Sequence, residues 1–227
     1  MQRSVLERLV ALRAAKRPVV LATDLTSGTQ SLIDPAEPAE DSPLAAAAAQ
    51  ALRDDRGGVH ETPEGTVFLN PFNPPLRLLL VGAVHIAQPL ASIALVAGYD
   101  VTVVDPRRAF ADTARFPGVT VLAEWPDEAM VTLAPDTRTA IVALTHDPKI
   151  DDPALSVALS GPAFYIGALG SKRTHARRLE RLASHGVDAA TLARIHGPVG
   201  LDIGARSPAE IAVSVLAQIT AVLRLPA

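Results

Sequence analysis

The stretch of the chain that most constrains its fold is a short apolar run that ends in a glycine. Residues 78–81 read Leu-Leu-Leu-Val, and Gly82 follows directly. A run this short, bounded by Pro75 and Gly82, is typical of a strand that is covered on both faces. Residues 86–97 then have the composition of a helix. The sequence therefore predicts a buried strand, a sharp turn and a helix in direct succession.

The turn matches the dinucleotide-binding fingerprint G-x-G-x-x-G/A only in part. Its three fixed positions fall on Gly82, Val84 and Ala87, so a β-branched side chain stands where the pattern has its middle glycine. A valine there would push a pyrophosphate away or change its pose. Asp105 follows Gly82 by 23 residues, close to the interval of about 20 at which an acidic residue usually meets a ribose hydroxyl. Nucleotide binding and a purely structural turn both remain open from the motif alone.

Strands and helices are predicted to alternate through the rest of the chain. Further strands are expected at residues 101–104, 119–122, 139–144 and 163–166. Further helices are expected at residues 126–133, 153–159, 172–184 and 189–195, and from residue 208 onward. Such alternation over about 150 residues predicts an α/β fold, a Rossmann-like doubly wound and mostly parallel sheet with right-handed crossovers.

The first third of the chain has a different pattern. Residues 3–15 have an apolar face at helical spacing, and residues 44–53 form an alanine-rich helix. Strands are predicted at residues 18–24, 29–33 and 67–69, with an acidic, proline-containing surface loop at residues 34–43. The proline-rich stretch at residues 70–75 is the expected boundary. The sequence thus predicts a small N-terminal α+β domain at residues 1–75 and a Rossmann-like domain at residues 76–227.

The composition excludes several classes of protein. Hydrophobic residues make up 48% of the chain and charged residues 20%, which is typical of a folded globular protein. A net charge of −3 gives no reason to expect nucleic-acid binding. The absence of cysteine excludes disulfides, thiolate metal sites and cysteine nucleophiles. No apolar run approaches the roughly 20 residues needed to cross a membrane, and the charged start does not resemble a signal peptide, so we expect a cytoplasmic protein.

Candidate ligand-binding residues follow four of the predicted strands. They are Gly82 and His85, Asp105 and Arg107, His146 and Asp147, and Gly170 and Ser171. Because ligands of parallel sheets bind outside the carboxyl ends of the strands, we expect these residues to converge on one edge. Asp202, in the loop at residues 197–207, is a further candidate ligand contact. No residue is predicted to be catalytic.

Each of these candidates also has a structural interpretation. His85 would either bind an anionic ligand or be satisfied by the backbone at a helix start. Asp105 and Arg107 would contact ribose and phosphate, or pair with each other. The backbone amides after Ser171 favour a phosphate, because the start of a helix carries partial positive charge. Imidazole and carboxylate ligands suit several divalent ions, but the spacing matches no known pattern, and no metal site is predicted.

Six motifs in order resemble one protein family. They are GAVHIAQPLA (82–91), DPR (105–107), THD (145–147), YIGALGSKRT (165–174), GPVGLDIGARSP (197–208) and EIAVSVLAQI (210–219). Together, over roughly residues 76–223, they resemble the XdhC/CoxI family of accessory proteins for xanthine dehydrogenase and related molybdenum hydroxylases. Two departures stand out: Val84 replaces the second glycine of the family's turn, and the N-terminal part lacks the family's glycine-glycine-cysteine stretch.

The resemblance implies a chaperone that is not itself a xanthine dehydrogenase. Such a protein binds the molybdenum cofactor (molybdopterin) as cargo, protects it during sulfuration and delivers it to an apo-enzyme. His146 and Asp147 would then orient the pterin ring, or simply cap the next helix. The implied partners are a molybdenum hydroxylase subunit of the xanthine dehydrogenase type and a cysteine desulfurase. Separately, the apolar N-terminal helices lead us to expect a homo-oligomer. Two alternatives stay open, an NAD(P)-dependent oxidoreductase and a scaffold that holds a hydroxylase subunit without binding a ligand.

Overall fold

The computed structural model describes residues 2–37, 42–63 and 65–225. Contacts within the chain divide it into two compact units, one ending at Pro74 and the other beginning at Pro75. The predicted boundary lies one residue from this division, and the assignment of the two parts as separate domains stays a prediction. None of the described helices is long and apolar enough to span a membrane.

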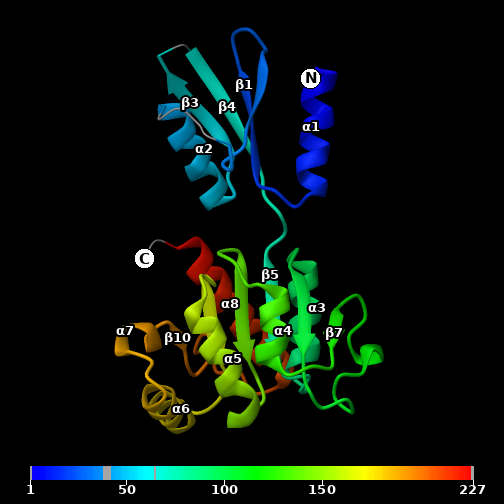
Figure 1. Cartoon of the computed structure of the whole chain (residues 1–227), viewed down its shortest axis with the longest axis vertical. Coiled ribbons are helices and arrows are strands. Elements are labelled where there is room, and N and C mark those ends of the chain that lie inside the picture. Colours follow the sequence, from blue (N-terminus) through cyan, green and yellow to red (C-terminus); the bar gives the residue numbers. More distant parts are fainter. Residues whose placement is uncertain (1, 38–41, 64, 226–227) are drawn as a thin grey trace. The chain divides into compact units, whose positions relative to one another are not determined.

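The N-terminal unit contains an antiparallel sheet in the order β2-β1-β4-β3 with a helix on each face (Figure 1). Its elements are α1 (Arg3–Ala14), β1 (Val19–Asp24), β2 (Gln30–Ile33), α2 (Pro43–Asp54), β3 (Gly58–Thr62) and β4 (Gly65–Phe72). Side chains of a strand alternate between its faces. Val20 and Ala22 therefore pack under α2, and Val19 packs under α1. The predicted α+β character of this region is confirmed.

Two features of this sheet differ from the prediction. The edge strand β3 was not predicted, because a glycine and several polar residues occupy it. β4 extends from residue 65 to Phe72 and takes in Pro71, which was expected to lie in a linker. β3 pairs with β4 only as far as Leu69, so Pro71 has a neighbouring strand on one side alone, where a proline is tolerated. Residues 38–41 of the predicted acidic loop lie outside the described residues.

The second unit is built on a parallel sheet of six strands in the order β10-β9-β8-β5-β6-β7. The strands are β5 (Arg77–Val81), β6 (Asp100–Val104), β7 (Thr120–Leu122), β8 (Thr139–Ala143), β9 (Tyr165–Ala168) and β10 (Ile195–His196). All neighbouring pairs are parallel. Counted from β5, this is the 3-2-1-4-5-6 order of a Rossmann fold, and the strand order reverses between β5 and β8. The predicted Rossmann-like sheet is confirmed.

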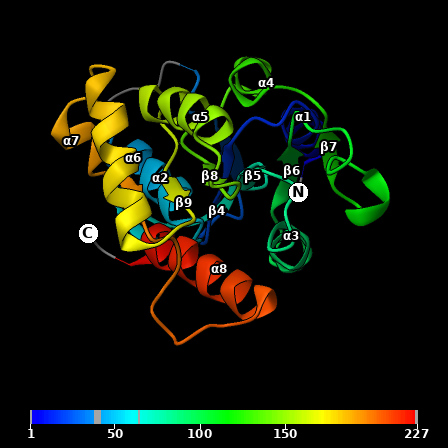
Figure 2. The ribbon, with the colours of Figure 1, turned by 90° about the horizontal axis from the view of Figure 1, so that it is seen from below.

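Helices cover both faces of the parallel sheet. They are α3 (Ala87–Val96), α4 (Pro126–Leu133), α5 (Pro148–Ser160), α6 (Lys172–Ser184), α7 (Ala189–Leu192) and α8 (Pro208–Arg224), with a short 3-10 helix at Thr113–Arg115. α3 and α8 lie together on one face, and α4, α5 and α6 lie on the other (Figure 2). α8 begins near residue 208 as predicted, with a capping box in which the side chains of Ser207 and Glu210 bond each other's backbone.

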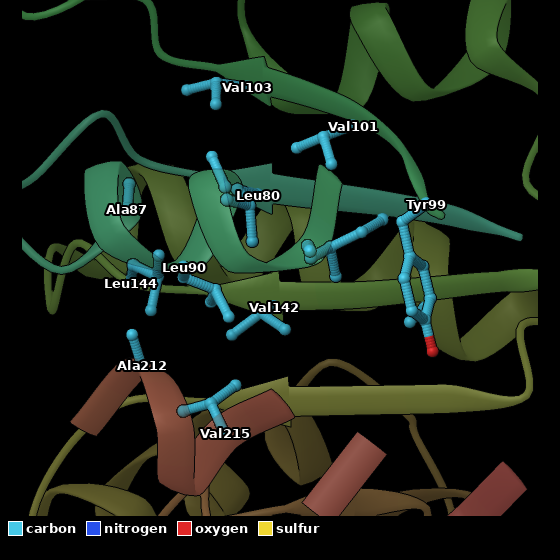
Figure 3. Packing of buried hydrophobic residues seen from close by; sticks show 14 of the residues in the cluster. Leu80, Ala87, Leu90, Tyr99, Val101, Val103, Val142, Leu144, Ala212 and Val215 are labelled. Atoms are coloured by element: carbon cyan, nitrogen blue, oxygen red, sulfur yellow. The ribbon is translucent and has the colours of Figure 1, made fainter. Parts of the chain in front are cut away.

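Strand β5 is buried on both sides, as its unbroken apolar run predicts. Leu78 and Leu80 face α3 and α8, where Leu80 lies beside Leu90 in a cluster that also contains Val142 and Val215 (Figure 3). Leu79 and Val81 face the opposite layer, against residues of α4 and α5. β5 is therefore the fixed element of the unit, and its C-terminal end lies at the reversal of strand order.

Three elements in this unit differ from the prediction. α5 begins at Pro148 and not near Pro153, because Asp147 caps the helix and a proline is well tolerated in a first turn. β9 occupies Tyr165–Ala168, two residues later than expected, because Gly167 and Ala168 pair with β8. The helix predicted at residues 189–195 ends at Leu192, and Ile195 instead begins β10, a two-residue strand too short to show apolar periodicity.

Candidate functional site

Gly82 begins the loop between β5 and α3 and is required by the fold itself. Its φ is +107°, a conformation that residues with a side chain rarely adopt. A Cβ at this position would overlap the side chain of Thr145, at the end of neighbouring β8. The next amide, of Ala83, donates a 2.8 Å hydrogen bond to Asp105 Oδ2. The turn thus holds three strand ends together before any ligand is considered.

Asp105, at the end of β6, is completely buried and is engaged by protein donors. The Arg107 amide and Nε each donate to Oδ1 at 2.9 Å, and Arg107 Nη2 donates to Oδ2 at 2.7 Å. With the bond from Ala83, each carboxylate oxygen accepts two hydrogen bonds. The two residues therefore pair with each other, which is one of the two interpretations expected from the sequence. Asp105 is the buried partner and Arg107 the partly exposed one.

These contacts control the charge of both groups. Burial raises the pKa of Asp105, but hydrogen bonds from Arg107 and Ala83 outweigh burial and hold that pKa below its usual range. The bond to Asp105 raises the pKa of Arg107, and the nearby negative charges of Asp147 and Asp151 raise it further. The Arg107 side chain is 36% exposed and its guanidinium lies 4.3 Å from the centre of the Phe110 ring. Arg107 is therefore a fixed positive charge that is still open to solvent.

The segment after β8 is organised around Asp151 on α5. Thr145 Oγ1 donates to Asp151 Oδ1 at 2.6 Å, and the His146 amide donates to Asp151 Oδ2 at 3.0 Å. His146 is exposed and has a left-handed backbone with φ of +63°. Asp147 accepts a hydrogen bond from the Lys149 amide at 3.0 Å and caps α5. Asp147 thus takes the capping role that was the structural alternative for this motif.

Asp151 is paired with Arg178 of α6, and both side chains are only 1% exposed. Arg178 Nη2 lies 3.6 Å from Asp151 Oδ2 and donates at 2.8 Å to the carbonyl of Leu169. Burial raises the pKa of Asp151 and lowers the pKa of Arg178, in each case against the opposing influence of the partner's charge. The long ion pair offsets only part of the cost of burying two charges.

The segment after β9 completes the edge. Ser171 caps α6, where its hydroxyl accepts a hydrogen bond from the Thr174 amide at 3.1 Å. A Cβ on Gly170 would lie 3.7 Å from His146 Nδ1, so the imidazole of His146 stands beside this glycine. Lys172, Arg173 and Arg177 are exposed on the helix that follows. The start of a helix therefore lies next to His146, and exposed positive side chains follow along that helix.

The structure brings most of the predicted residues to one edge of the sheet, but not all into contact. Gly82 meets the Thr145 side chain, and His146 meets Gly170. His85 is exposed at the turn before α3. Asp202 is exposed in the loop before α8, and within the described part of the chain no hydrogen bond or ion pair joins it to the other predicted residues. Which of these residues contact a ligand stays a prediction.

Sequence reasoning missed the buried pair of Asp151 and Arg178, which joins the segment after β8 to the segment after β9. Asp151 was not singled out, because the start of α5 was placed too late. Arg178 was not singled out either, because it stands among several other cations on its helix. A signal existed, since Arg178 stands four residues before the buried Leu182 and shares its helix face.

The arrangement is suited to binding and orienting an anion. The partly exposed guanidinium of Arg107, the imidazole of His146 and the start of α6 supply positive charge or hydrogen-bond donors around the edge. Among the described residues, no three histidine, aspartate or glutamate side chains are grouped so that they could hold a metal ion.

Comparison with known families agrees with this geometry. Residues 78–219 match the model of the family described as the XdhC Rossmann domain. The chain belongs to the XdhC family. The resemblance drawn from the six motifs is thereby confirmed. The matched residues include every segment of the sheet edge that carries the predicted ligand-binding residues, which we call the candidate edge.

Three curated relatives of this XdhC protein have similar sequences. The uncharacterized protein YqeB of Escherichia coli (strain K12) is 34% identical over 171 residues, 75% of this chain and 31% of the relative. The molybdenum cofactor insertion chaperone PaoD of the same strain is 35% identical over 151 residues, 66% and 41% of the two chains. A probable xanthine dehydrogenase subunit of Bacillus subtilis (strain 168) is 34% identical over 154 residues, 67% and 44%. The match thus spans less than half of each relative.

A solved structure supports the fold of the whole chain. The crystal structure of a xanthine dehydrogenase from Bacillus halodurans superposes with a TM-score of 0.73 and covers 98% of this chain and 67% of that one. The two sequences are 23% identical over the match, so this likeness concerns the fold alone.

Proposed function

We propose that this XdhC-family protein binds the molybdenum cofactor and assists its insertion into a molybdenum hydroxylase of the xanthine dehydrogenase type. The observation that carries the proposal is the 35% identity to the insertion chaperone PaoD. The client class is further supported by the similarity to a probable xanthine dehydrogenase subunit. The cofactor is cargo in this proposal, and the protein is a chaperone and not itself a hydroxylase.

The candidate edge suits such a cargo. The molybdenum cofactor is anionic, and Arg107 offers a fixed positive charge that is partly open to solvent. His85 and His146 are exposed at the ends of two other loops, where their imidazoles can donate hydrogen bonds. The start of α6, capped by Ser171, favours negative charge. We assign these residues to cofactor binding, with Gly82 and Gly170 allowing close approach of the loops.

A dinucleotide enzyme is less well supported. An acidic residue that binds a ribose must have a carboxylate oxygen free to accept from its hydroxyls. Asp105 is completely buried and accepts four hydrogen bonds from Ala83 and Arg107. Its carboxylate therefore acts inside the protein, and an NAD(P)-dependent oxidoreductase would need another ribose acceptor.

The proposed partners follow from the enzyme that would receive the cofactor. A molybdenum hydroxylase subunit would receive the cofactor, and a cysteine desulfurase would act on the cofactor while it is held. The exposed cations Lys172, Arg173 and Arg177 would attract an acidic partner surface by long-range electrostatics. Self-association of the chain is a further proposal.

Equilibrium binding of isolated molybdenum cofactor to the purified protein tests the function. We expect saturable binding by the wild type, weakened about tenfold by His85→Ala, the loss expected for about 1.4 kcal/mol of binding free energy. His185→Ala is the matched control, because His185 is also exposed but lies at the opposite end of α6 from Ser171. No detectable binding by the wild type, with persistent co-purification of a hydroxylase subunit, would favour a scaffold instead.

A further inference from the structure

His146 has a backbone conformation that its position does not explain. Three other described residues that are not glycine have positive φ, namely Lys16, Asp55 and Ala134. Each of them stands at or just after the C-terminal end of a helix, where a left-handed residue is common. His146 stands instead between a strand and the start of a helix. Something other than helix termination must hold it there, because a left-handed conformation is unfavourable for a residue with a side chain.

Asp151 supplies that restraint. Its Oδ2 accepts from the His146 amide at 3.0 Å, and its Oδ1 accepts from Thr145 Oγ1 at 2.6 Å and from the Thr145 amide at 3.3 Å. Two consecutive amides thus point at one buried carboxylate. The segment cannot return to an extended conformation without leaving that charge with fewer donors.

Arg178 fixes the carboxylate from the other side. It lies 3.6 Å from Asp151 and also bonds the carbonyl of Leu169, in the loop that leads to Gly170. One buried pair therefore anchors both the segment that carries His146 and the segment that His146 faces. The outcome is that the His146 imidazole lies within van der Waals distance of the place where a Gly170 side chain would begin.

We propose that Asp151 is a positioning residue for ligand binding: it holds His146 in the left-handed conformation that places the imidazole beside Gly170. There the imidazole donates a hydrogen bond to an oxygen of the bound anion. This inference rests on the proposed function for the identity of that ligand, the molybdenum cofactor. The restraint itself is a property of the protein without its cargo.

The first test measures stability without a ligand. His146→Ala removes the imidazole and keeps the strained backbone, whereas His146→Gly removes the imidazole and the strain. We expect His146→Gly to unfold at a temperature a few degrees higher than His146→Ala. We expect this advantage to shrink when Asp151→Asn or Thr145→Val loosens the restraint. Equal stability of the glycine and alanine variants would overturn the proposal.

The second test measures binding of isolated molybdenum cofactor. We expect Asp151→Asn to weaken binding about tenfold when His146 is present and to add little in a His146→Ala background, because the two residues act as a unit. Thr145→Val keeps the side-chain shape but removes the hydroxyl that donates to the Asp151 carboxylate and accepts from the Asp147 amide. It serves if Asp151→Asn does not fold. Equal weakening in both backgrounds would show a merely structural role and reject the positioning of His146.

The two tests separate this inference from the proposed function. Absence of cofactor binding by the wild type would reject the function and with it the ligand contact given to His146. The stability comparison would still decide whether Asp151 holds a strained residue. A wild type that binds the cofactor, with Asp151 and His146 acting independently, would reject this inference and leave the function in place.

Discussion

Gly82 and Thr145, which follow adjacent strands of the parallel sheet, approach so closely that a Cβ on Gly82 would overlap the Thr145 Cγ2. The glycine of the dinucleotide-like turn is therefore demanded by packing between β5 and β8. Its presence in the sequence is not by itself evidence of a pyrophosphate, since the same residue would be needed without any ligand.

This relationship predicts the cost of Gly82→Ala. The substitution adds both a steric clash and a side chain at φ of +107°, and we expect a loss of about 2–4 kcal/mol in the free energy of unfolding. Gly98→Ala is the matched control, because Gly98 also has positive φ but open space around it, so its loss should be about 1 kcal/mol. Chemical denaturation measures both. Equal losses would mean that Thr145 yields to the new side chain.

Asp105→Asn should destabilise the protein in a pH-dependent manner. An amide NH₂ would face donors of Ala83 or Arg107, and we expect a loss of about 2–3 kcal/mol at neutral pH. The pKa of Asp105 is lowered in the folded state. Its stabilising contribution is therefore present above its unfolded-state pKa of about 3.9 and is lost as the pH falls through the lower folded-state pKa.

The gap in unfolding free energy between wild type and Asp105→Asn should accordingly narrow as the pH falls from about 6 to about 3. Denaturant titrations at a series of pH values measure this. Asp202→Asn, at an exposed carboxylate, provides the comparison and should change stability little. A gap that stays constant with pH would contradict the charged, hydrogen-bonded state assigned to Asp105.

Gln218 should stabilise the attachment of the loop before α8 to strand β9. Its Oε1 accepts from Tyr165 Oη at 2.6 Å and from the Gly200 amide at 2.8 Å, so it ties β9 to that loop. Gln218→Leu would leave both donors without this acceptor, and we expect a loss of about 2–3 kcal/mol. Thr220→Val, at an exposed position on the same helix, should stay within about 0.5 kcal/mol of the wild type. Thermal unfolding of the two variants distinguishes them.

Val84→Gly should not create a dinucleotide site. The substitution restores the glycine pattern, but Asp105 would still be saturated by Ala83 and Arg107 and could not accept from a ribose. We expect no binding of NAD or NADP by isothermal titration calorimetry with either the wild type or the variant. Binding by the variant alone would mean that Val84 was the obstacle and that Asp105 can exchange its partners.

Much of the candidate edge could be predicted from sequence, because local sequence patterns indicate where the strands end. The apolar run before Gly82 and the strand before Asp105 predict where two parallel strands end, and strand ends of one sheet meet at one edge. The ordered motifs indicated the XdhC family, and the family match confirms it. Short edge strands such as β3 and β10 escaped prediction, because pairing with a neighbour stabilises them more than their own composition does.

The sequence by itself determined the alternation of strands and helices, the buried nature of β5 and the family of the chain. Only the tertiary structure decided that Asp105 is saturated by Ala83 and Arg107, and that Asp151 pairs with Arg178 to hold the segment around His146. The physical reason is the range of the interactions. Hydrophobic periodicity and turn preferences act over a few residues and can be read along the chain. Hydrogen bonds between a carboxylate and an amide or guanidinium from another loop require the strands to be in register first.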